Sequence, residues 1–183
     1  MYKRQVQVIV LIATLILSFL MVRRIERMSV AAARTMFLVF SALFGFTMSI
    51  YLLIYDLASL VFAFLATALY FGVLAVYGRL TGRDLSGVRP ILFSGLLFLV
   101  IFGVISLFIP ALSVFDSIVC LIGIAVFLGY TAYDTQRIRA FYHYYAGYPD
   151  MLEKASIFAA LQLYLDFVNL FLYLLRFLGR RRD

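Results

Sequence analysis

The stretch at residues 161–176, LQLYLDFVNLFLYLLR, decides how this chain folds. All of it except Arg176 lies in an apolar run, residues 155–175, in which Asp166 is the only charged side chain. One face of the stretch carries Gln162, Asp166, Asn169, Tyr173 and Arg176. Their spacings of four, three, four and three residues place them within about 80° of one another on an α-helix. A carboxylate near the middle of a membrane span is costly unless it faces protein, water or a partner, so Asp166 is a candidate functional residue.

The whole chain has the composition of a membrane protein. Of its 183 residues, 66% are hydrophobic and only 14% are charged, which is too apolar for a soluble globular domain. Apolar runs of 17 to 22 residues lie at 6–22, 35–55, 57–78, 91–109, 117–133 and 155–175, and a spanning helix needs about 20 residues. The sequence therefore predicts an all-α, polytopic integral membrane helix bundle. Six transmembrane helices would form a single integral membrane domain over residues 1–183.

Basic residues flank these runs in an alternating pattern. Three loops carry Arg23, Arg24, Arg27, Arg34, Arg79, Arg83, Arg89, Arg137, Arg139 and Lys154, and the two turns between these loops carry none. By the positive-inside rule, the basic loops are cytoplasmic. The net charge of +7 is thus explained by topology and does not indicate a nucleic-acid partner. Both chain ends are also basic, so either a further helix precedes the chain or the last segment enters the membrane and returns.

Metal and cofactor chemistry is restricted by the residue inventory. The chain has one cysteine, Cys120, and one histidine, His143, which excludes the usual zinc ligand sets. Any bound metal would be a hard cation held by oxygen atoms. We find no phosphate-binding glycine loop, and we expect neither a cofactor nor a catalysed reaction.

A second acid, Asp134, directly follows the run 117–133, and the sequence after it remains compatible with a helix to Tyr145. If that helix ends near Tyr145 and the last one begins near Ala155, Asp134 and Asp166 each lie eleven residues from the same membrane face. Eleven helical residues correspond to about 16 Å. The two carboxyl groups would then share a depth.

Three motifs carry a resemblance to a known family: LTGRDLS at 80–86, GYTAYDTQ at 129–136 and LYLDFVNLF at 163–171. With them, the chain resembles the Bax inhibitor-1/YccA family of small integral membrane proteins over essentially its whole length. The resemblance implies a seven-helix bundle with the last helix at its centre, of which this chain lacks the first helix. It also implies a pH-sensitive calcium leak gated by an aspartate pair, here Asp134 and Asp166, with an arginine latch for which Arg23 and Arg24 are the candidates.

Elementary electrostatics gives a mechanism for such a pair. Two neighbouring carboxylates in a low dielectric cannot both ionise easily, so they titrate as a unit that shares one proton. Loss of that proton adds repulsion, and gain of a second removes the charge-assisted hydrogen bond; the direction of the pH response stays open. In an open state, the carboxylates, with Gln162 and Asn169 nearby, would transiently bind Ca²⁺, and weak binding suits conduction.

Other interpretations of these residues remain. Asp166 would be a structural carboxyl, and Asp134 would pair with Arg137 one turn away. Gln162 and Asn169 would form interhelical hydrogen bonds, and His143 would be a solvated interfacial residue.

At the level of function, the family also suggests a regulatory protein that binds and inhibits a partner, either a membrane AAA protease or a cell-death pathway component. A proton-coupled carrier is a third hypothesis. We expect the partners to be the lipid bilayer, Ca²⁺, protons and another membrane protein, and the location to be the bacterial inner membrane.

Overall fold

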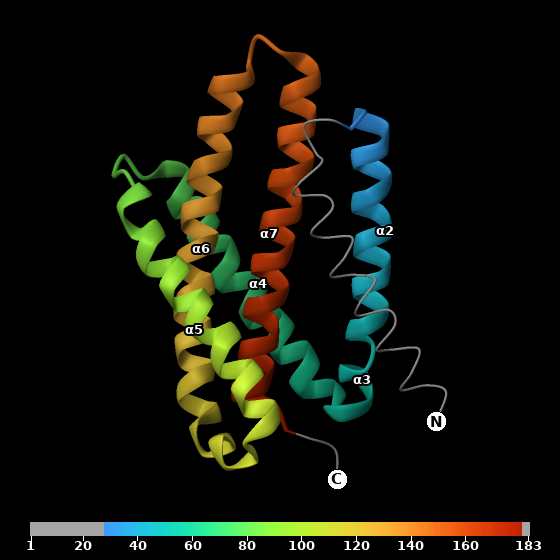
Figure 1. The fold of residues 1–183 in the computed structure, drawn as a ribbon, viewed down its shortest axis with the longest axis vertical. Coiled ribbons are helices and arrows are strands. Elements are labelled where there is room, and N and C mark those ends of the chain that lie inside the picture. Colours follow the sequence, from blue (N-terminus) through green and yellow to red (C-terminus); the bar gives the residue numbers. More distant parts are fainter. Residues whose placement is uncertain (1–27, 181–183) are drawn as a thin grey trace.

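The computed structural model describes residues 28–180, and within them the chain is helical without strands. The α-helices are α2 (Val30–Met48), α3 (Tyr51–Ile54), α4 (Leu57–Leu80), α5 (Arg89–Phe108), α6 (Asp116–Tyr145) and α7 (Pro149–Leu178) (Figure 1). Two short 3-10 helices, η2 (Ser86–Val88) and η3 (Pro110–Phe115), precede α5 and α6. The predicted all-α class is confirmed.

Five segments of the described chain are long and apolar enough to cross a membrane. They are Val30–Ile54, Leu57–Leu80, Ser86–Ser106, Pro110–Tyr145 and Pro149–Leu178. These segments confirm a polytopic membrane bundle. The predicted span at 6–22 lies outside the described residues, so the total of six stays a prediction.

Local chemistry sets the start of several helices. Ser29 caps α2, because its hydroxyl accepts a hydrogen bond from the backbone N–H of Ala32 at 3.2 Å. Asp56 caps α4 in the same way, with the N–H of Ser59 at 2.7 Å. Both are N-cap residues of the preferred type. Helix α7 begins at Pro149, where a proline suits the first turn because its missing N–H would have no partner.

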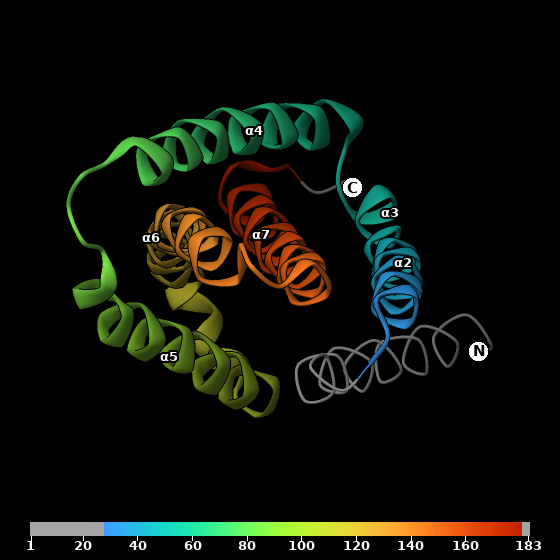
Figure 2. The same ribbon diagram turned by 90° about the horizontal axis from the view of Figure 1, so that it is seen from above.

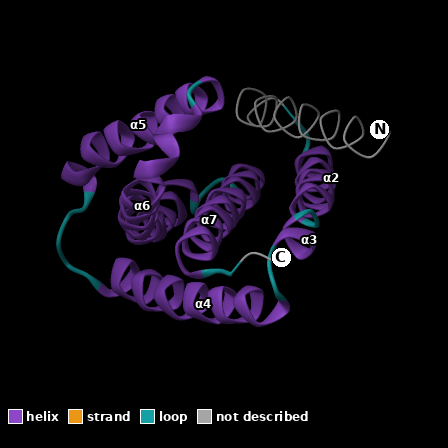
Figure 3. Ribbon diagram, turned by 90° about the horizontal axis from the view of Figure 1, so that it is seen from below, coloured by secondary structure: helices purple, strands orange, loops and turns teal. Residues whose placement is uncertain are grey.

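The last two helices form the centre of the bundle. Viewed along the bundle, α6 and α7 lie side by side, with α4 along one flank, α5 along another and α2–α3 beside α7 (Figure 2). The view from the opposite side shows the same arrangement (Figure 3). The central position expected for the last helix is confirmed.

Glycines allow the outer helices to approach α6 closely. A Cβ atom at Gly78 of α4 would lie 2.2 Å from the backbone oxygen of Ala132, so the two backbones touch at this point. A Cβ at Gly95 of α5 would lie 2.5 Å from Val126. Small residues at such crossings are the main means by which helices associate in lipid.

Helix α7 crosses the bundle once, from the α6–α7 loop to the opposite end (Figure 1). The idea that the last segment enters the membrane and returns is therefore wrong for the described residues. The end of α7 is attached to the start of α4, where the N–H of Asp56 donates to the carbonyl of Arg180 at 3.3 Å and the N–H of Arg180 donates to the Ser59 hydroxyl at 3.0 Å. We call the other end of the bundle, which carries the α4–α5 and α6–α7 loops, the basic end.

Candidate functional site

Asp134 of α6 and Asp166 of α7 face each other across the central helix pair. Each residue is only 6% exposed, and their carboxyl groups lie within hydrogen-bonding reach of each other. The Oδ2 atom of Asp166 is enclosed by protein and has no hydrogen-bond partner among the described residues. Two ionised carboxylates at this distance repel each other, so a hydrogen bond between them requires that one of the two carboxyl groups carries a proton.

The helix ends that we used to predict this pairing are only partly right. Helix α6 does end at Tyr145, but α7 begins at Pro149, six residues before the expected start. Asp166 is therefore 17 residues from the start of α7, whereas Asp134 is eleven residues from the end of α6. The two acids do lie side by side, but their distances from the helix ends, which we used to predict this, are not equal.

The outer helices show where the pair lies along the bundle. Ala132, two residues before Asp134, contacts Gly78 in the last turn of α4. Gln136, two residues after Asp134, binds the α4–α5 loop. At 1.5 Å per residue, Asp134 thus lies within about 3 Å of the level at which α4 ends. Asp166 is central in α7, as predicted, but the pair lies close to the basic end of α4 and α5.

Sequence reasoning missed the role of Gln136. Its side-chain oxygen accepts from the N–H of Leu85 at 2.9 Å, and its nitrogen donates to the carbonyl of Arg83 at 2.7 Å. The amide thus fastens the α4–α5 loop to α6 beside Asp134. Its place at the end of the GYTAYDTQ motif was the one available signal.

The α4–α5 loop carries an acid of a different kind. Asp84 is fully exposed, and its carboxylate accepts two hydrogen bonds from Ser86, from the N–H and from the hydroxyl, both at 2.8 Å. These bonds hold the pKa of Asp84 below its usual range. Asp84 thus stabilises the turn, as an exposed aspartate commonly does.

The neighbours of the acid pair are phenolic, hydroxylic and cationic. Tyr130 is close enough to interact electrostatically with both acids and with Arg89 of α5. Thr131 is fully buried, and its hydroxyl donates to the carbonyl of Phe127 at 2.8 Å. Arg137 is also near Asp134, but its guanidinium lies 4.8 Å from the ring centre of Phe141. Within residues 28–180, Arg137 and Asp134 form no salt bridge.

The rest of the polar stripe on α7 faces α6 in part. Tyr173 stacks on Phe127 with ring centres 5.9 Å apart. Arg176 donates to Asp116 at the start of α6, at 3.0 Å. The amide nitrogen of Asn169, in contrast, donates to the carbonyl of Leu165 in its own helix at 2.8 Å.

The remaining residues singled out in the sequence are His143, the latch candidates, the metal ligands and the amides of α7. His143 is exposed, and its ring lies 5.8 Å from that of Tyr142. The latch candidates Arg23 and Arg24 lie outside the described residues. In the described part of the chain, no three His, Cys, Asp or Glu side chains come together as a metal site would need. The roles predicted for Gln162 and Asn169 stay predictions.

Comparisons with known proteins agree with the bundle and its motifs. A family model described as "Inhibitor of apoptosis-promoting Bax1" matches residues 2–183. The protein RP147 of Rickettsia prowazekii (strain Madrid E) is 43% identical over 157 residues, which cover 86% of this chain and 66% of RP147. The inner membrane protein YbhL of Escherichia coli (strain K12) is 38% identical over 173 residues, which cover 94% of this chain and 74% of YbhL. The chain thus spans about two thirds to three quarters of the length of these relatives. It belongs to the Bax inhibitor-1 family and, like YbhL, is a multi-pass inner membrane protein.

Proposed function

We propose that this protein is a pH-sensitive leak for Ca²⁺ or a similar cation, in which Asp134 and Asp166 form the gate. One observation supports the proposal above all others. Two buried acids on the two central helices lie within hydrogen-bonding reach, and Oδ2 of Asp166 has no hydrogen-bond partner among the described residues. Buried acids inside a membrane bundle are expensive to keep and commonly mark an ion or proton pathway.

In the closed state, one shared proton joins the carboxyl groups and holds α6 against α7. Loss of this proton leaves two adjacent negative charges, which repel each other and attract a divalent cation. Ca²⁺ and the proton therefore compete for the same oxygen atoms. Two carboxylates provide far fewer than the six to eight oxygen ligands of a tight calcium site, so the ion passes on instead of remaining bound.

The sign of the pH response follows from this competition. Raising the pH removes the shared proton, which both weakens the closed contact and creates the cation site, so flux rises with pH. Tyr130 and Arg137 of α6 lie near the pair, and Arg89 of α5 interacts with Tyr130. They set the pH at which the change occurs. The transported ion crosses unchanged, so the proposal includes no covalent step and no bound cofactor.

The test is Ca²⁺ flux in liposomes that contain the purified protein and an internal calcium-sensitive dye, from pH about 5 to about 8. The native protein should show flux that rises with pH. In Asp134→Asn and Asp166→Asn, the amide supplies a permanent donor to the remaining carboxylate, so flux should be low at every pH. The control is Asp150→Asn, which removes an exposed carboxylate from the first turn of α7.

Two outcomes contradict the proposal. Equal flux in the native protein and both pair variants at every pH would show that the acids do not gate it. A purified membrane partner that stays bound to both variants, together with an absence of pH-dependent flux in the native protein, would favour a regulatory binding protein.

A further inference from the structure

The acid pair lies at the point where α6 leaves the core of the bundle. Asp134 is the last buried residue of α6. The residues that follow it in this helix, 135–145, are all partly or fully exposed. Residues 119–132, which precede it, include seven that are buried. Helix α6 therefore carries its acid at the boundary between a buried part and an exposed part.

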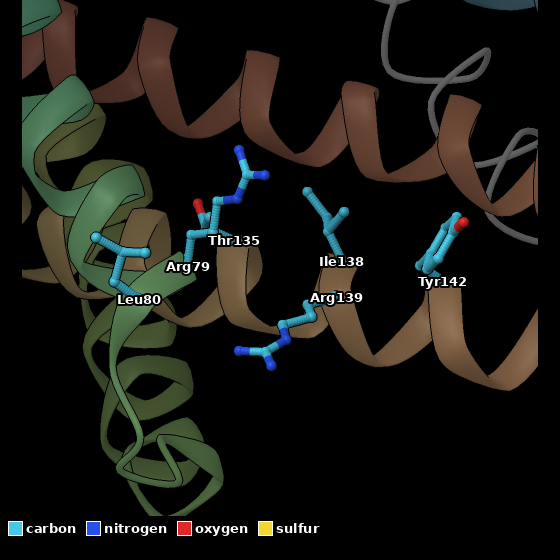
Figure 4. A pocket seen from close by; sticks show the side chains of 6 residues that line it. All are labelled: Arg79, Leu80, Thr135, Ile138, Arg139 and Tyr142. Atoms are coloured by element: carbon cyan, nitrogen blue, oxygen red, sulfur yellow. The ribbon is translucent and has the colours of Figure 1, made fainter.

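The groups beyond this boundary are those of a surface that faces water. Arg79 in the last turn of α4 and Arg139 of α6 are both exposed, and they lie beside Thr135, the residue that follows Asp134 (Figure 4). An arginine at the end of a membrane span extends its guanidinium group toward the interface. Gln136 also holds the hydrophilic α4–α5 loop against α6 at this level. We therefore expect water within one helical turn of Asp134 on the side of the basic end.

The opposite side of the pair is closed by apolar packing. Leu170, one turn after Asp166, is fully buried, and it belongs to one core cluster with Phe127 and Leu174. The next charged side chain of α7 after Asp166 is Arg176, which lies about 15 Å further along the helix at 1.5 Å per residue. A charge is costly inside such a layer. The packing therefore separates the pair from the water at the other end.

We propose that the acid pair takes up and releases its proton only from the basic end, and thus responds to the pH on that side of the membrane alone. The inference rests on the proposed function, in which Asp134 and Asp166 share one proton. The step is a proton transfer between water at the basic end and a carboxylate oxygen, and no other bond forms or breaks. The positive-inside rule places the basic end in the cytoplasm, so the pair senses cytoplasmic pH.

The other charged and titratable groups near the pair come from three helices. Tyr130 and Arg137 of α6 interact with it, and Arg89 of α5 interacts with Tyr130. Arg79 is the only charged residue of α4. Helix α7 carries no further charged side chain within two turns of the pair, and its tyrosines there pack against aromatic rings of α2 and α6. Arginine and tyrosine keep their charge between pH about 5 and about 8, so a change in this range does not come from them.

The test uses membrane vesicles of both orientations from cells that express the full chain, with a different buffered pH inside and outside. The infrared carbonyl band that the native protein has and Asp166→Asn lacks reports the protonated carboxyl group of the pair. Raising the pH from about 5 to about 8 on the side of the basic end should remove this band. The same change on the other side should leave the band intact.

A cysteine identifies the side that the basic end faces. Gly82 is exposed in the α4–α5 loop, and a Cβ there would meet nothing within 4 Å. The thiol of Gly82→Cys should therefore react with an impermeant maleimide only from that side. The native cysteine, Cys120, is buried and provides the background.

The outcomes keep this inference apart from the proposed leak. A band that follows the pH of the other side, or of both sides equally, would overturn one-sided exchange, and pH-dependent Ca²⁺ flux in the same vesicles would leave the leak in place. A one-sided band with flux that does not depend on pH would support one-sided exchange and contradict the gate. Absence of a band specific to Asp166 would overturn both, since no proton would then be shared.

A variant in the apolar layer tests why the other side is closed. Leu170→Ser replaces a fully buried side chain with a small polar one, which gives water both room and a partner. Its band should respond to the pH on both sides. The matched control is Leu178→Ser, which changes a leucine of α7 that is 44% exposed and should keep the one-sided response. A one-sided response in monodisperse Leu170→Ser would contradict the inference, because the layer would not be what closes that side.

Discussion

Ionisable side chains connect α6 and α7 at two levels, and we call these two contacts the joints. One joint is a pair of acids, and the other is a pair of opposite charges. Toward the basic end, Asp134 and Asp166 are both acids, and both are buried. Toward the other end, Arg176 and Asp116 carry opposite charges 3.0 Å apart, with side chains 41% and 38% exposed. Opposite charges attract whenever both groups are ionised, whereas two acids attract only while they share a proton. Under the proposed function, the contact near the basic end is the one that changes with pH.

The packing between these joints is apolar and continuous. Phe127, Leu170 and Leu174 are buried there in one cluster with Val119 and Val126, and the ring of Tyr173 lies against Gly123, where an added Cβ would meet it at 2.6 Å. This core keeps the helices together whether or not the acid pair holds a proton. If the acid pair gates the protein as proposed, loss of its proton would alter the contact near the basic end while the opposite end stays joined.

The largest effect should come from breaking the backbone contact that supports the acid pair. In Gly78→Ala, the new Cβ would lie 2.2 Å from the carbonyl oxygen of Ala132, so α4 must move away from α6. We expect the free energy of unfolding to fall by about 1–3 kcal/mol, as in other overpacked sites, and the melting temperature in detergent to fall with it. Gly72→Ala is the control, because a Cβ at Gly72 meets nothing within 4 Å. Equal melting temperatures for the two variants would mean that the close approach at Gly78 is not needed.

The second prediction concerns the pH dependence of stability. Deprotonation of the pair places two negative charges side by side in the folded state only, so the stability of the native protein should fall as the pH rises. Asp166→Asn leaves a single carboxylate with an amide donor and should flatten this slope. The measurement is the melting temperature in detergent across pH about 5 to about 8.

Asp150→Asn serves as the control for that slope and should retain it. If Asp166→Asn keeps the native slope, the pair does not share a proton in the folded protein, and both the comparison of the joints and the proposed gate fail together.

The third prediction concerns the amide that fastens the α4–α5 loop beside the pair. Gln136→Ala removes the hydrogen bonds to Leu85 and Arg83, and we expect a loss of about 1–2 kcal/mol with faster amide hydrogen exchange in residues 81–88. Gln162→Ala removes the other glutamine of the two central helices, whose side chain forms no hydrogen bond with a described residue, and should change neither quantity. Unchanged exchange in Gln136→Ala would show that the loop is held by other contacts.

The features of the fold and of the site that depend on neighbouring residues could be predicted from the sequence, and those that depend on contacts between distant residues could not. Apolar run lengths predict the spans well, because hydropathy reports residues that face lipid, and a lone acid in such a run identifies Asp166. The start of α7 was placed too late, because its first turns, PDMLEK, are polar although they are helical. The contacts of Gln136 join residues 51 and 53 positions apart, and no local pattern encodes them. The same holds for the position of the pair beside the end of α4, which depends on how three helices cross.

The smallest effect should come from the joint at the other end. Arg176→Gln removes an ion pair that is partly exposed to solvent, and such pairs contribute about 0–1 kcal/mol. We expect a slightly lower melting temperature at low salt, little difference from native at high salt because ions screen the pair, and the native slope of stability against pH. Asp116→Asn should behave in the same way, and the double variant should lose no more than either single one, since both remove one interaction. If Arg176→Gln instead abolished the pH slope, the two joints would be coupled through the apolar core, and the basic end would not respond alone.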